Sequence, residues 1–344
     1  MEIAGLIWNE SIHYIDHLAP FCSLLDCPLI VCEPTILELC TTFYPNLKLE
    51  YVPVRSLLNH LPPCLISCEP RPLLEISLRL KPDFYKIAWL PHGMSDKGWK
   101  LPWFEALEKE DWLLVYGSRM KQVLQAKKIA IPQISVGNFR YRYFLEHQTF
   151  YRQIVKKHLP AERLVLFAPT WEDSEENGTF FDAFPYFSSA SQIAIKLHPN
   201  TEKAFLPQIE RLKGSNENIH FIENFPPIYP ILDQTDVYIG DMSSIGYDFL
   251  MFDRPLFFLR KKIAHPEKDP SSYLMKGGEQ VLIQDLPSLL ENWRNKKDFQ
   301  SERFVLKREA FDKSPSTFLR FSNGRFSHPK SCLNTSCNSS NFPS

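Results

Sequence analysis

The sequence predicts an α/β fold of two domains, each built around a parallel β-sheet. Its 344 residues exceed the size at which one hydrophobic core keeps growing. Short apolar runs rich in β-branched and aromatic residues alternate with longer segments of helical period, which is the pattern of βα units around parallel sheets. The series runs twice along the chain and restarts near residue 160. We therefore expect two βα domains that meet at this position.

The first domain is predicted to span residues 1–159. Leu159 stands before Pro160, and proline disfavours helix in the residue before it, so the preceding helix ends there. A further helix is expected from Ser118, a favourable N-cap residue, to Lys127, because apolar residues recur three and four positions apart. The predicted strands of this domain cover residues 3–8, 29–32, 47–52, 64–68, 87–90, 113–116 and 134–136.

The second domain is predicted to span residues 160–312 and repeats the pattern. Its predicted strands cover residues 164–168, 193–197, 220–222, 237–240 and 256–259, with helices near 202–213, 243–252 and 286–296. From residue 313 the sequence fills with Ser, Asn, Pro and Cys, a composition that buries too little apolar surface to offset chain entropy. We expect residues 313–344 to form an irregular, loose tail.

The composition excludes several classes of function. Lys and Arg (39) nearly balance Asp and Glu (40), so no global field attracts nucleic acid. The apolar runs are far shorter than the roughly 20 residues that span a bilayer, and the N-terminus lacks the pattern of a secretory signal, so a cytoplasmic protein is expected. The eight cysteines contain no C-x-x-C pair, which favours reduced thiols over disulfides or zinc. No metal site is predicted.

A histidine follows the end of a predicted strand in the first domain. His92 is followed by Gly93 and, a few residues later, by Lys97. Open α/β sheets bind ligands beyond the carboxyl ends of their strands, and an imidazole placed there can take a proton from a hydroxyl. A structural histidine in a turn made by Pro91 and Gly93 is the alternative. The motifs of the second domain favour the functional interpretation.

Two strands of the second domain also end in polar residues. The strand at 164–168 is followed by Pro169, Thr170 and Trp171. Taken alone, this pattern indicates only a strand that ends at a proline. In the strand at 193–197, alternation places Lys196 and His198 on one face, where two cations suit phosphate oxygens or a leaving phosphate. The alternative is that Lys196 and His198 lie on a solvated strand edge. The apolar neighbours Ile193, Ile195 and Leu197 favour a buried strand that ends at a cleft.

The strand that ends at Gly240 is followed by Ser243 and Ser244, which begin a predicted helix. The first amides of a helix have no partner within it, so they and the serine hydroxyls can bind the oxygens of a diphosphate, with the helix dipole contributing about 0.3–1 kcal/mol. A capping role for Ser243 is compatible with this site. Asp241 and Asp248 are candidates for binding a sugar or ribose hydroxyl, with a solvated carboxylate as the alternative for each.

In their order along the chain, these motifs resemble the signature of the CDP-glycerol glycerophosphotransferase family. The resemblance rests on His92 and Gly93 with Lys97, on residues 168–171, 196–199 and 241–244, and on Asp248 with residues 253–255. It covers roughly residues 85–260. It implies the GT-B fold, in which two Rossmann-like domains face each other across a cleft. It also implies a transferase of teichoic-acid-like polymer synthesis, with CDP-glycerol as co-substrate and no firmly implied cofactor.

The resemblance further implies a role for each matching residue. The donor diphosphate lies near Ser243 and Ser244, and His92 acts from the first domain as general base on the acceptor hydroxyl. His198 and Lys196 stabilise charge on the phosphates as CMP leaves. The remaining candidates, for phosphate or substrate contact, are Thr170, Gly93, Lys97, Asp241 and Asp248.

One departure from the family pattern leaves the donor open. Family members commonly carry an arginine after the aromatic residue of the Ala-Pro-Thr motif, whereas Glu172 and Asp173 follow Trp171 here. A CDP-activated polyol donor is expected. The alternatives are a GT-B glycosyltransferase that uses a nucleotide sugar and a non-catalytic nucleotide-binding relative.

The acceptor implied by the resemblance is a hydroxyl of a lipid-linked or polymer component of the cell envelope, and a requirement for a divalent cation stays open. Because the family acts at the membrane face, the aromatic and basic segment 139–157 is a candidate for peripheral contact with the membrane. Packing between the domains is the alternative for this segment.

Overall fold

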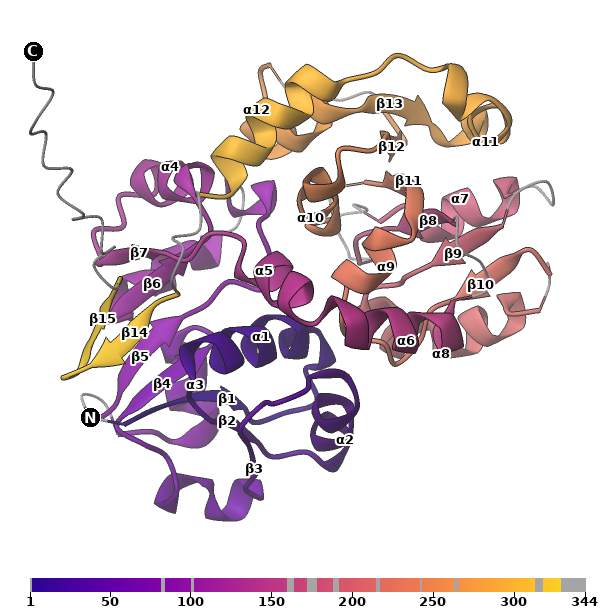
Figure 1. Cartoon of the computed structure of the whole chain (residues 1–344). Helices are drawn as coiled ribbons and strands as arrows, with labels where there is room; N and C mark the ends of the chain where they lie inside the picture. The colour runs from indigo at the N-terminus through magenta and orange to yellow at the C-terminus, as the bar shows by residue number, and fades with distance from the viewer. Residues whose placement is uncertain are drawn as a thin grey trace, which may run out of the picture.

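Two parallel β-sheets form the framework of the molecule (Figure 1). The computed structural model describes residues 2–81, 84–99, 102–159, 164–171, 178–187, 192–214, 217–241, 243–262, 265, 267–312 and 318–328. The first sheet ends with β7 and the second begins with β8, and the predicted boundary at residue 160 falls between these two strands.

The first sheet has seven parallel strands in the order β3-β2-β1-β4-β5-β6-β7. This is the Rossmann order extended by one strand, and the direction of strand addition reverses between β1 and β4. The strands are β1 (Ile3–Ile7), β2 (Leu29–Val31), β3 (Leu49–Tyr51), β4 (Cys64–Ser67), β5 (Lys86–Trp89), β6 (Trp112–Val115) and β7 (Gln133–Ser135).

Helices and short 3-10 turns connect these strands. The helices are α1 (Ile15–Leu25), α2 (Pro34–Phe43), α3 (Arg71–Leu78), α4 (Ser118–Ala126), α5 (Phe139–Glu146) and α6 (Gln148–His158). The 3-10 turns are η1 (Ile12–Tyr14), η2 (Val54–Asn59), η3 (Asp96–Trp99) and η4 (Pro102–Lys109).

The second sheet has six parallel strands in the order β10-β9-β8-β11-β12-β13, which repeats the Rossmann order with the reversal between β8 and β11. Its strands are β8 (Leu164–Ala168), β9 (Ile193–Ile195), β10 (Ile219–Phe221), β11 (Thr235–Gly240), β12 (Leu256–Arg260) and β13 (Glu279–Leu282). Its helices are α7 (Phe180–Ala183), α8 (Pro199–Leu212), α9 (Tyr229–Asp233), α10 (Ile245–Phe249), α11 (Leu286–Asn292) and α12 (Gln300–Ala310). Its 3-10 turns are η5 (Phe184–Tyr186), η6 (Leu250–Phe252), η7 (Pro270–Gly277), η8 (Ile283–Asp285) and η9 (Trp293–Asn295).

The predicted fold class is confirmed, and each of the twelve predicted strands overlaps a strand of the structure. Strand β13 was missed. Its segment, with Glu279 and Gln280 ahead of Val281, carries too short an apolar run to indicate a buried strand.

Helix α5 lies between the two domains, against α1 on one side and α9 on the other (Figure 1). One continuous apolar core passes through this region, and aromatic pairs connect the domains within it. The rings of Phe43 and Phe225 lie 4.9 Å apart, and those of Tyr141 and Tyr229 lie 5.5 Å apart. Because this contact is apolar and buried, the structure holds the two domains in a defined relation.

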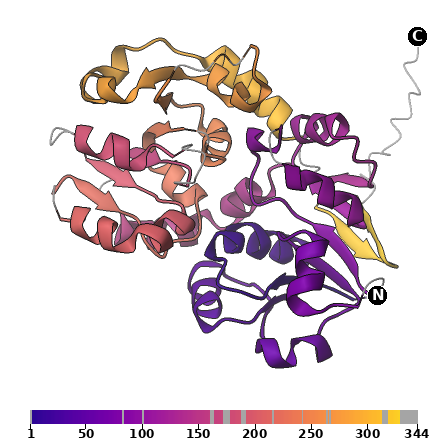
Figure 2. The same ribbon diagram turned by 180° about the vertical axis from the view of Figure 1, so that it is seen from behind.

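The chain returns to the first domain after the second sheet. The carbonyl of Glu309 in α12 accepts a hydrogen bond from Ser118 of α4 at 3.1 Å, and Asp312, just beyond α12, pairs with Lys121 of α4 at 2.8 Å. Beyond it, an antiparallel hairpin of β14 (Arg320–Ser322) and β15 (Arg325–Ser327) lies beside the first domain in both views (Figures 1 and 2).

The hairpin corrects the expectation of an irregular tail for residues 318–328. The rings of Phe321 and Phe326 stand edge-on to Trp112 of β6 at 6.3 and 5.5 Å, and Phe318 and Leu319 are buried. Three phenylalanines within nine residues supply an apolar face that the polar composition around them obscured. Residues 329–344 of the predicted tail lie outside the described residues.

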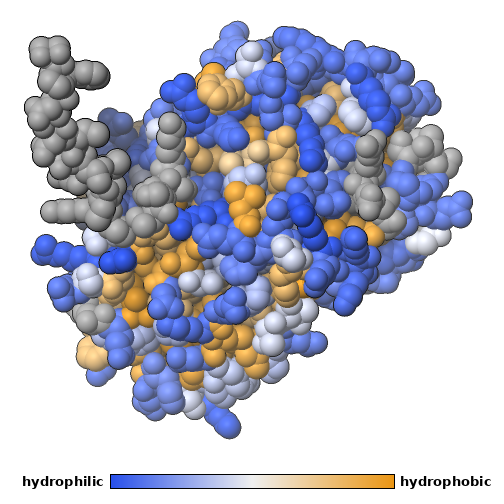
Figure 3. Space-filling model, in the orientation of Figure 1, coloured by the Kyte–Doolittle hydropathy of each residue, from blue (hydrophilic) through white to orange (hydrophobic). Residues whose placement is uncertain are grey.

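The surface differs between the two domains. On the face shown in Figure 3, hydrophilic residues dominate over the second domain, whereas apolar residues gather over the first. None of the helices in the described part of the chain has the length and apolar character that crossing a membrane requires. In segment 139–157, the rings of Phe139, Tyr143, Phe144 and Tyr151 are buried and those of Tyr141 and Phe150 are half-buried against the core, so its aromatic side serves domain packing.

Candidate active site

The predicted motifs lie at the carboxyl ends of strands around the two points where strand order reverses. Thr170 follows β8, and Ser243 and Ser244 follow β11, its neighbour across the reversal. In the first domain His92 follows β5, the strand next to β4. Ligands of open α/β sheets bind in the crevice at such a point, and here the crevices of both sheets face each other.

The two sides of this site touch at Gly93 and Ser244. Gly93 has a φ of +117°, and a Cβ atom built on it would lie 2.7 Å from Oγ and 2.9 Å from Cβ of Ser244. A small cavity close to this contact is lined from both domains, with Ser95 and Asp96 of the first and Ser243, Ser271 and Leu274 of the second among its lining residues. The loop of His92 and the predicted phosphate-binding serines are therefore adjacent across the domain interface.

Three histidines from both domains gather at this interface. The ring of His13 lies 5.6 Å from that of His92 and 5.5 Å from that of His198, measured between centroids. His13 belongs to η1, which follows β1 at the reversal point of the first sheet. Their motifs predicted His92 and His198, whereas His13 stands in an irregular turn without a recognisable motif and was missed. Its position shortly after β1 was the signal that could have revealed it.

His13 is held in its neutral form. Burial, together with the smaller effects of the neighbouring His92 and His198, lowers the pKa of His13 to about 3. At neutral pH the ring of His13 is therefore uncharged, and the three rings do not all carry a positive charge. In the described ranges, no group of three or more His, Cys, Asp or Glu side chains is placed to hold a metal ion.

His198 has a defined orientation. It caps α8, and its Nδ1 accepts a hydrogen bond from the backbone amide of Asn200 at 3.1 Å. Because Nδ1 acts as the acceptor, the proton of the neutral ring is on Nε2, which can donate to a phosphate oxygen. The ring edge of Trp171 lies near it, at 6.2 Å between centroids.

Lys196 directly follows β9 and is half-buried. Its Nζ donates to the carbonyl oxygen of Ile222 at 3.3 Å, so the hydrogen bond that the structure records runs to the end of β10. Burial lowers the pKa of the ammonium, while the nearby carboxylate of Glu202 opposes this shift. The phosphate contact expected of Lys196 stays a prediction.

The serines occupy the start of α10, as predicted. The amide of Ile245 donates to Oγ of Ser243 at 3.4 Å, and the amide of Tyr247 donates to the carbonyl of Ser244 at 3.0 Å. Both serines are half-buried and close to the His92 loop through Gly93. Because the amides of Ile245, Gly246 and Tyr247 donate within this turn, the serine hydroxyls are the groups that this segment can offer to a phosphate.

Asp241 has a structural role that the sequence did not reveal. It is 1% exposed, its Oδ1 accepts from the amide of Thr170 at 2.7 Å and its Oδ2 accepts from the hydroxyl of Thr179 at 3.0 Å. Both carboxylate oxygens thus fix the segments that follow β8. We reassign Asp241 from binding a sugar or ribose hydroxyl to holding this loop, and Thr170 is itself buried within it.

Asp241→Ala is expected to lower the free energy of unfolding by about 2–4 kcal/mol, because two buried donors lose a charged acceptor. Chemical denaturation followed by circular dichroism measures the change. Glu291→Ala, which removes an exposed carboxylate of the same domain, is the control and should stay within about 0.5 kcal/mol of the parent. Equal stability of the two variants would contradict the role given to Asp241.

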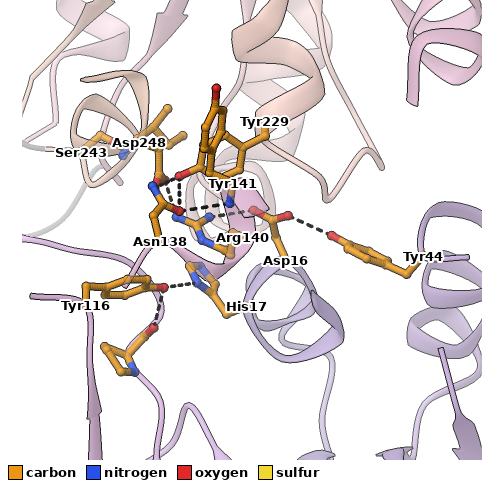
Figure 4. Close-up of polar contacts among 12 residues, drawn as sticks. Asp16, His17, Tyr44, Tyr116, Asn138, Arg140, Tyr141, Tyr229, Ser243 and Asp248 are labelled. Carbon is orange, nitrogen blue, oxygen red and sulfur yellow. Dashed lines mark hydrogen bonds and ion pairs between the residues drawn. The ribbon is translucent and has the colours of Figure 1, made fainter. Parts of the chain in front are cut away.

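Asp248 is also engaged within the protein (Figure 4). It is 2% exposed, pairs with Arg140 through Oδ2, and its Oδ1 lies 2.8 Å from the hydroxyl of Tyr229. The structure therefore places Asp248 in a contact between the domains and not at a substrate hydroxyl. The side chain of Lys97, and Glu172 and Asp173, lie outside the described residues.

Two Rossmann-like domains with facing crevices and a site between them define the class of GT-B proteins, and comparison with known proteins supports this class. Residues 146–275 match the family described as CDP-Glycerol:Poly(glycerophosphate) glycerophosphotransferase, which is the family that the motifs resemble. A segment of 115 residues is 31% identical to a teichoic acid glycerol-phosphate primase of Bacillus spizizenii. That match covers 30% of this chain and 27% of the primase, so it spans about a quarter of the relative.

Solved structures share the fold over most of the chain. The wall teichoic acid polymerase TagF superposes with a TM-score of 0.60 at 13% identity, covering 90% of this chain and 84% of that one. A UDP-GlcNAc 2-epimerase from Neisseria meningitidis, bound to UDP-GlcNAc, superposes with a TM-score of 0.55 at 14% identity, covering 90% and 97%. At these identities the likeness defines the fold alone.

Proposed function

We propose that this chain is a CDP-glycerol-dependent glycerophosphotransferase. The observation that carries the proposal is the convergence of His92, His13 and His198 beside the contact between Gly93 and Ser244, where both sheets open toward each other. A transferase needs a donor phosphate and an acceptor hydroxyl brought together, and this arrangement supplies candidate groups for each from opposite domains.

In the proposed reaction, CDP-glycerol binds to the second domain with its diphosphate at Ser243 and Ser244. His92 takes the proton of the acceptor hydroxyl as that oxygen attacks the phosphorus attached to glycerol. A new P–O bond forms to the acceptor, the anhydride P–O bond to CMP breaks, and the Nε2 hydrogen of His198 stabilises the charge on the phosphates. General-base catalysis contributes roughly 10²–10⁴ to the rate, and positioning supplies much of the remainder.

The acceptor in this proposal is a hydroxyl of a lipid-linked or polymer component of the cell envelope. The chain would act in the cytoplasm, in peripheral contact with the inner face of the membrane. CDP-glycerol serves as a co-substrate, without a resident cofactor. The family match of residues 146–275 supports the donor class.

A donor panel tests the function. CDP-glycerol, CDP-ribitol and UDP-GlcNAc are compared by thermal shift and by release of CMP or UDP, with a lipid-linked glycerol phosphate as acceptor. We expect CDP-glycerol to raise the melting temperature and CMP to appear only with the acceptor. Repeating the assay with EDTA and with Mg²⁺ measures the need for a divalent cation.

The fold shared with a UDP-GlcNAc 2-epimerase keeps a nucleotide-sugar enzyme as the second candidate. Release of UDP alone would support that candidate and contradict the proposal. Binding of CDP-glycerol without turnover on any acceptor would instead support a non-catalytic relative.

A further inference from the structure

Helix α10, which follows the phosphate-binding serines, is attached to the first domain through two consecutive residues. The hydroxyl of Tyr247 donates to Oδ2 of Asp96 at 2.8 Å, and Asp248 pairs with Arg140. Asp96 stands four residues after His92, and Arg140 lies in the first turn of α5, so both attachments lead into the first domain. The position of α10 relative to His92 therefore depends on these two buried contacts.

Arg140 joins carboxylates from both domains (Figure 4). It is 3% exposed, its Nη1 donates to Oδ2 of Asp16 on α1 at 2.7 Å, and its Nη2 donates to Oδ2 of Asp248 on α10. The second oxygen of Asp16 accepts from the hydroxyl of Tyr44 at 3.0 Å, and the second oxygen of Asp248 lies 2.8 Å from the hydroxyl of Tyr229. Each carboxylate is thus oriented by a tyrosine on the side opposite Arg140.

The helix at the other end of this link carries groups of the candidate site. Asp16 stands three residues after His13 and directly before His17. Nδ1 of His17 lies 3.0 Å from the hydroxyl of Tyr116, which donates to the carbonyl of Pro91 at 3.3 Å, the residue before His92. Helix α1 therefore contacts the His92 loop from one side and Arg140 from the other.

We propose that Arg140 is a positioning residue for the transfer reaction. It holds the serine-bearing start of α10 at a fixed distance from His92 by bridging Asp248 to Asp16. The inference rests on the proposed function for the roles of the serines and His92. The bridge from Asp16 through Arg140 to Asp248 stands on the contacts of the structure alone. Arg140 touches neither reacting group in this arrangement and acts through α10 and α1.

The chemistry of the bridge requires a guanidinium. Its planar fork directs separate N–H groups at two carboxylates at once, which a lysine ammonium on a flexible stem does not reproduce with the same geometry. Burial raises the pKa of Asp16 to about 6 and also raises that of Asp248, and the charge of Arg140 opposes both shifts. Without Arg140 the two carboxyl groups are left buried without their cation, and water would enter between the domains to solvate them.

The first test measures, without any substrate, how close the two domains lie to each other. Glu10 and Lys203 form an exposed ion pair at 3.3 Å between the two domains. Both are replaced by cysteine in a chain that also carries Cys332→Ser and Cys337→Ser, since the six cysteines of the described residues are buried. A short bis-maleimide then links the two cysteines. The rate follows the fraction of molecules in which the two domains lie as they do in the structure, which we call the closed arrangement.

We expect Arg140→Lys and the milder Asp248→Asn to slow this cross-linking by about fivefold or more, because they shift the population away from the closed arrangement. Arg71→Lys is the matched control. Arg71 is also buried and pairs with carboxylates, but its partners Asp111 and Glu75 belong to the first domain alone. The control should cross-link within about twofold of the parent.

The second test separates binding from turnover. Arg140→Lys and Asp248→Asn should lower kcat by about 100-fold, because a displacement of about 1 Å between reacting groups has that effect. The Kd for CDP-glycerol should change less than about threefold, since the serines stay within one domain. Arg71→Lys should lower the melting temperature without this loss of kcat.

The outcomes distinguish this inference from the proposed function. Cross-linking at the parental rate in both bridge variants, or an unchanged kcat, would overturn the role of Arg140. Absence of CDP-glycerol turnover in the parent would contradict the proposed function, while slowed cross-linking in the same preparations would still support the bridge. If Arg140→Lys fails to fold, Asp248→Asn, which keeps the size and an acceptor oxygen, decides the result.

Discussion

Replacing His92 with alanine is expected to reduce turnover of CDP-glycerol by about 10²–10⁴-fold, the usual contribution of a general base. The Kd for the donor should stay within about threefold of the parent, because the serines proposed to bind its phosphates are on the other domain. Isothermal titration with CDP-glycerol and a CMP-release assay on the same preparation measure both quantities.

The structure gives the physical reason for this split. His92 is exposed at the interface, so an acceptor hydroxyl can reach it, while the neighbouring ring of His13 is neutral and poorly suited to accept the proton. The contact of Gly93 with Ser244 places the base next to the donor side. Loss of the imidazole thus removes the proton acceptor without changing the phosphate donors.

His60→Ala serves as the control for this prediction, because His60 is an exposed histidine of the same domain within the short segment around η2. It should turn over at the parental rate. A His92→Ala protein that releases CMP as fast as the parent would show that the base lies elsewhere.

The fold and the position of the site could be predicted from the sequence because both follow from local patterns. Alternating apolar runs define parallel strands, and the carboxyl ends of such strands mark the binding crevice. This rule brought His92, His198 and Ser243 to one interface. It gives the edge at which a residue lies, but it does not give the direction in which the side chain turns.

The residues that were misassigned or missed depend on contacts made only in the folded chain. In the sequence, Asp248 stands close to the predicted phosphate-binding serines and therefore resembles a ligand-binding residue. Its partner Arg140 is more than 100 residues away along the chain, so the pair could not be predicted. Asp241 likewise meets Thr170 and Thr179 across separate segments. His13 follows β1 in an irregular turn, where neither helical nor strand periodicity applies. Such pairings are set by the packing of the domains and leave no periodic signal in the chain.

The second large effect is expected from Gly93→Ala. The added Cβ would lie 2.7 Å from Oγ and 2.9 Å from Cβ of Ser244, so the loop and α10 must separate. Alanine must also adopt a φ of +117°, which a residue with a Cβ rarely does. We expect kcat/KM to fall by about 100-fold or more, as the base and the donor phosphates move apart, and the free energy of unfolding to fall by about 1–3 kcal/mol.

Gly214→Ala distinguishes the clash from the backbone strain. Gly214 also has a positive φ, +75°, but a Cβ there meets no described atom within 4 Å, so only strain is added. It should lose about 1 kcal/mol of stability and keep its activity. Adding Ser244→Gly to Gly93→Ala removes both atoms that the new methyl group meets, and should restore part of the lost stability, though not the donor affinity that the serine provides. If Gly93→Ala instead behaves as Gly214→Ala does, the loop and α10 are not in contact in solution, and the transfer reaction cannot be assembled from these two sides.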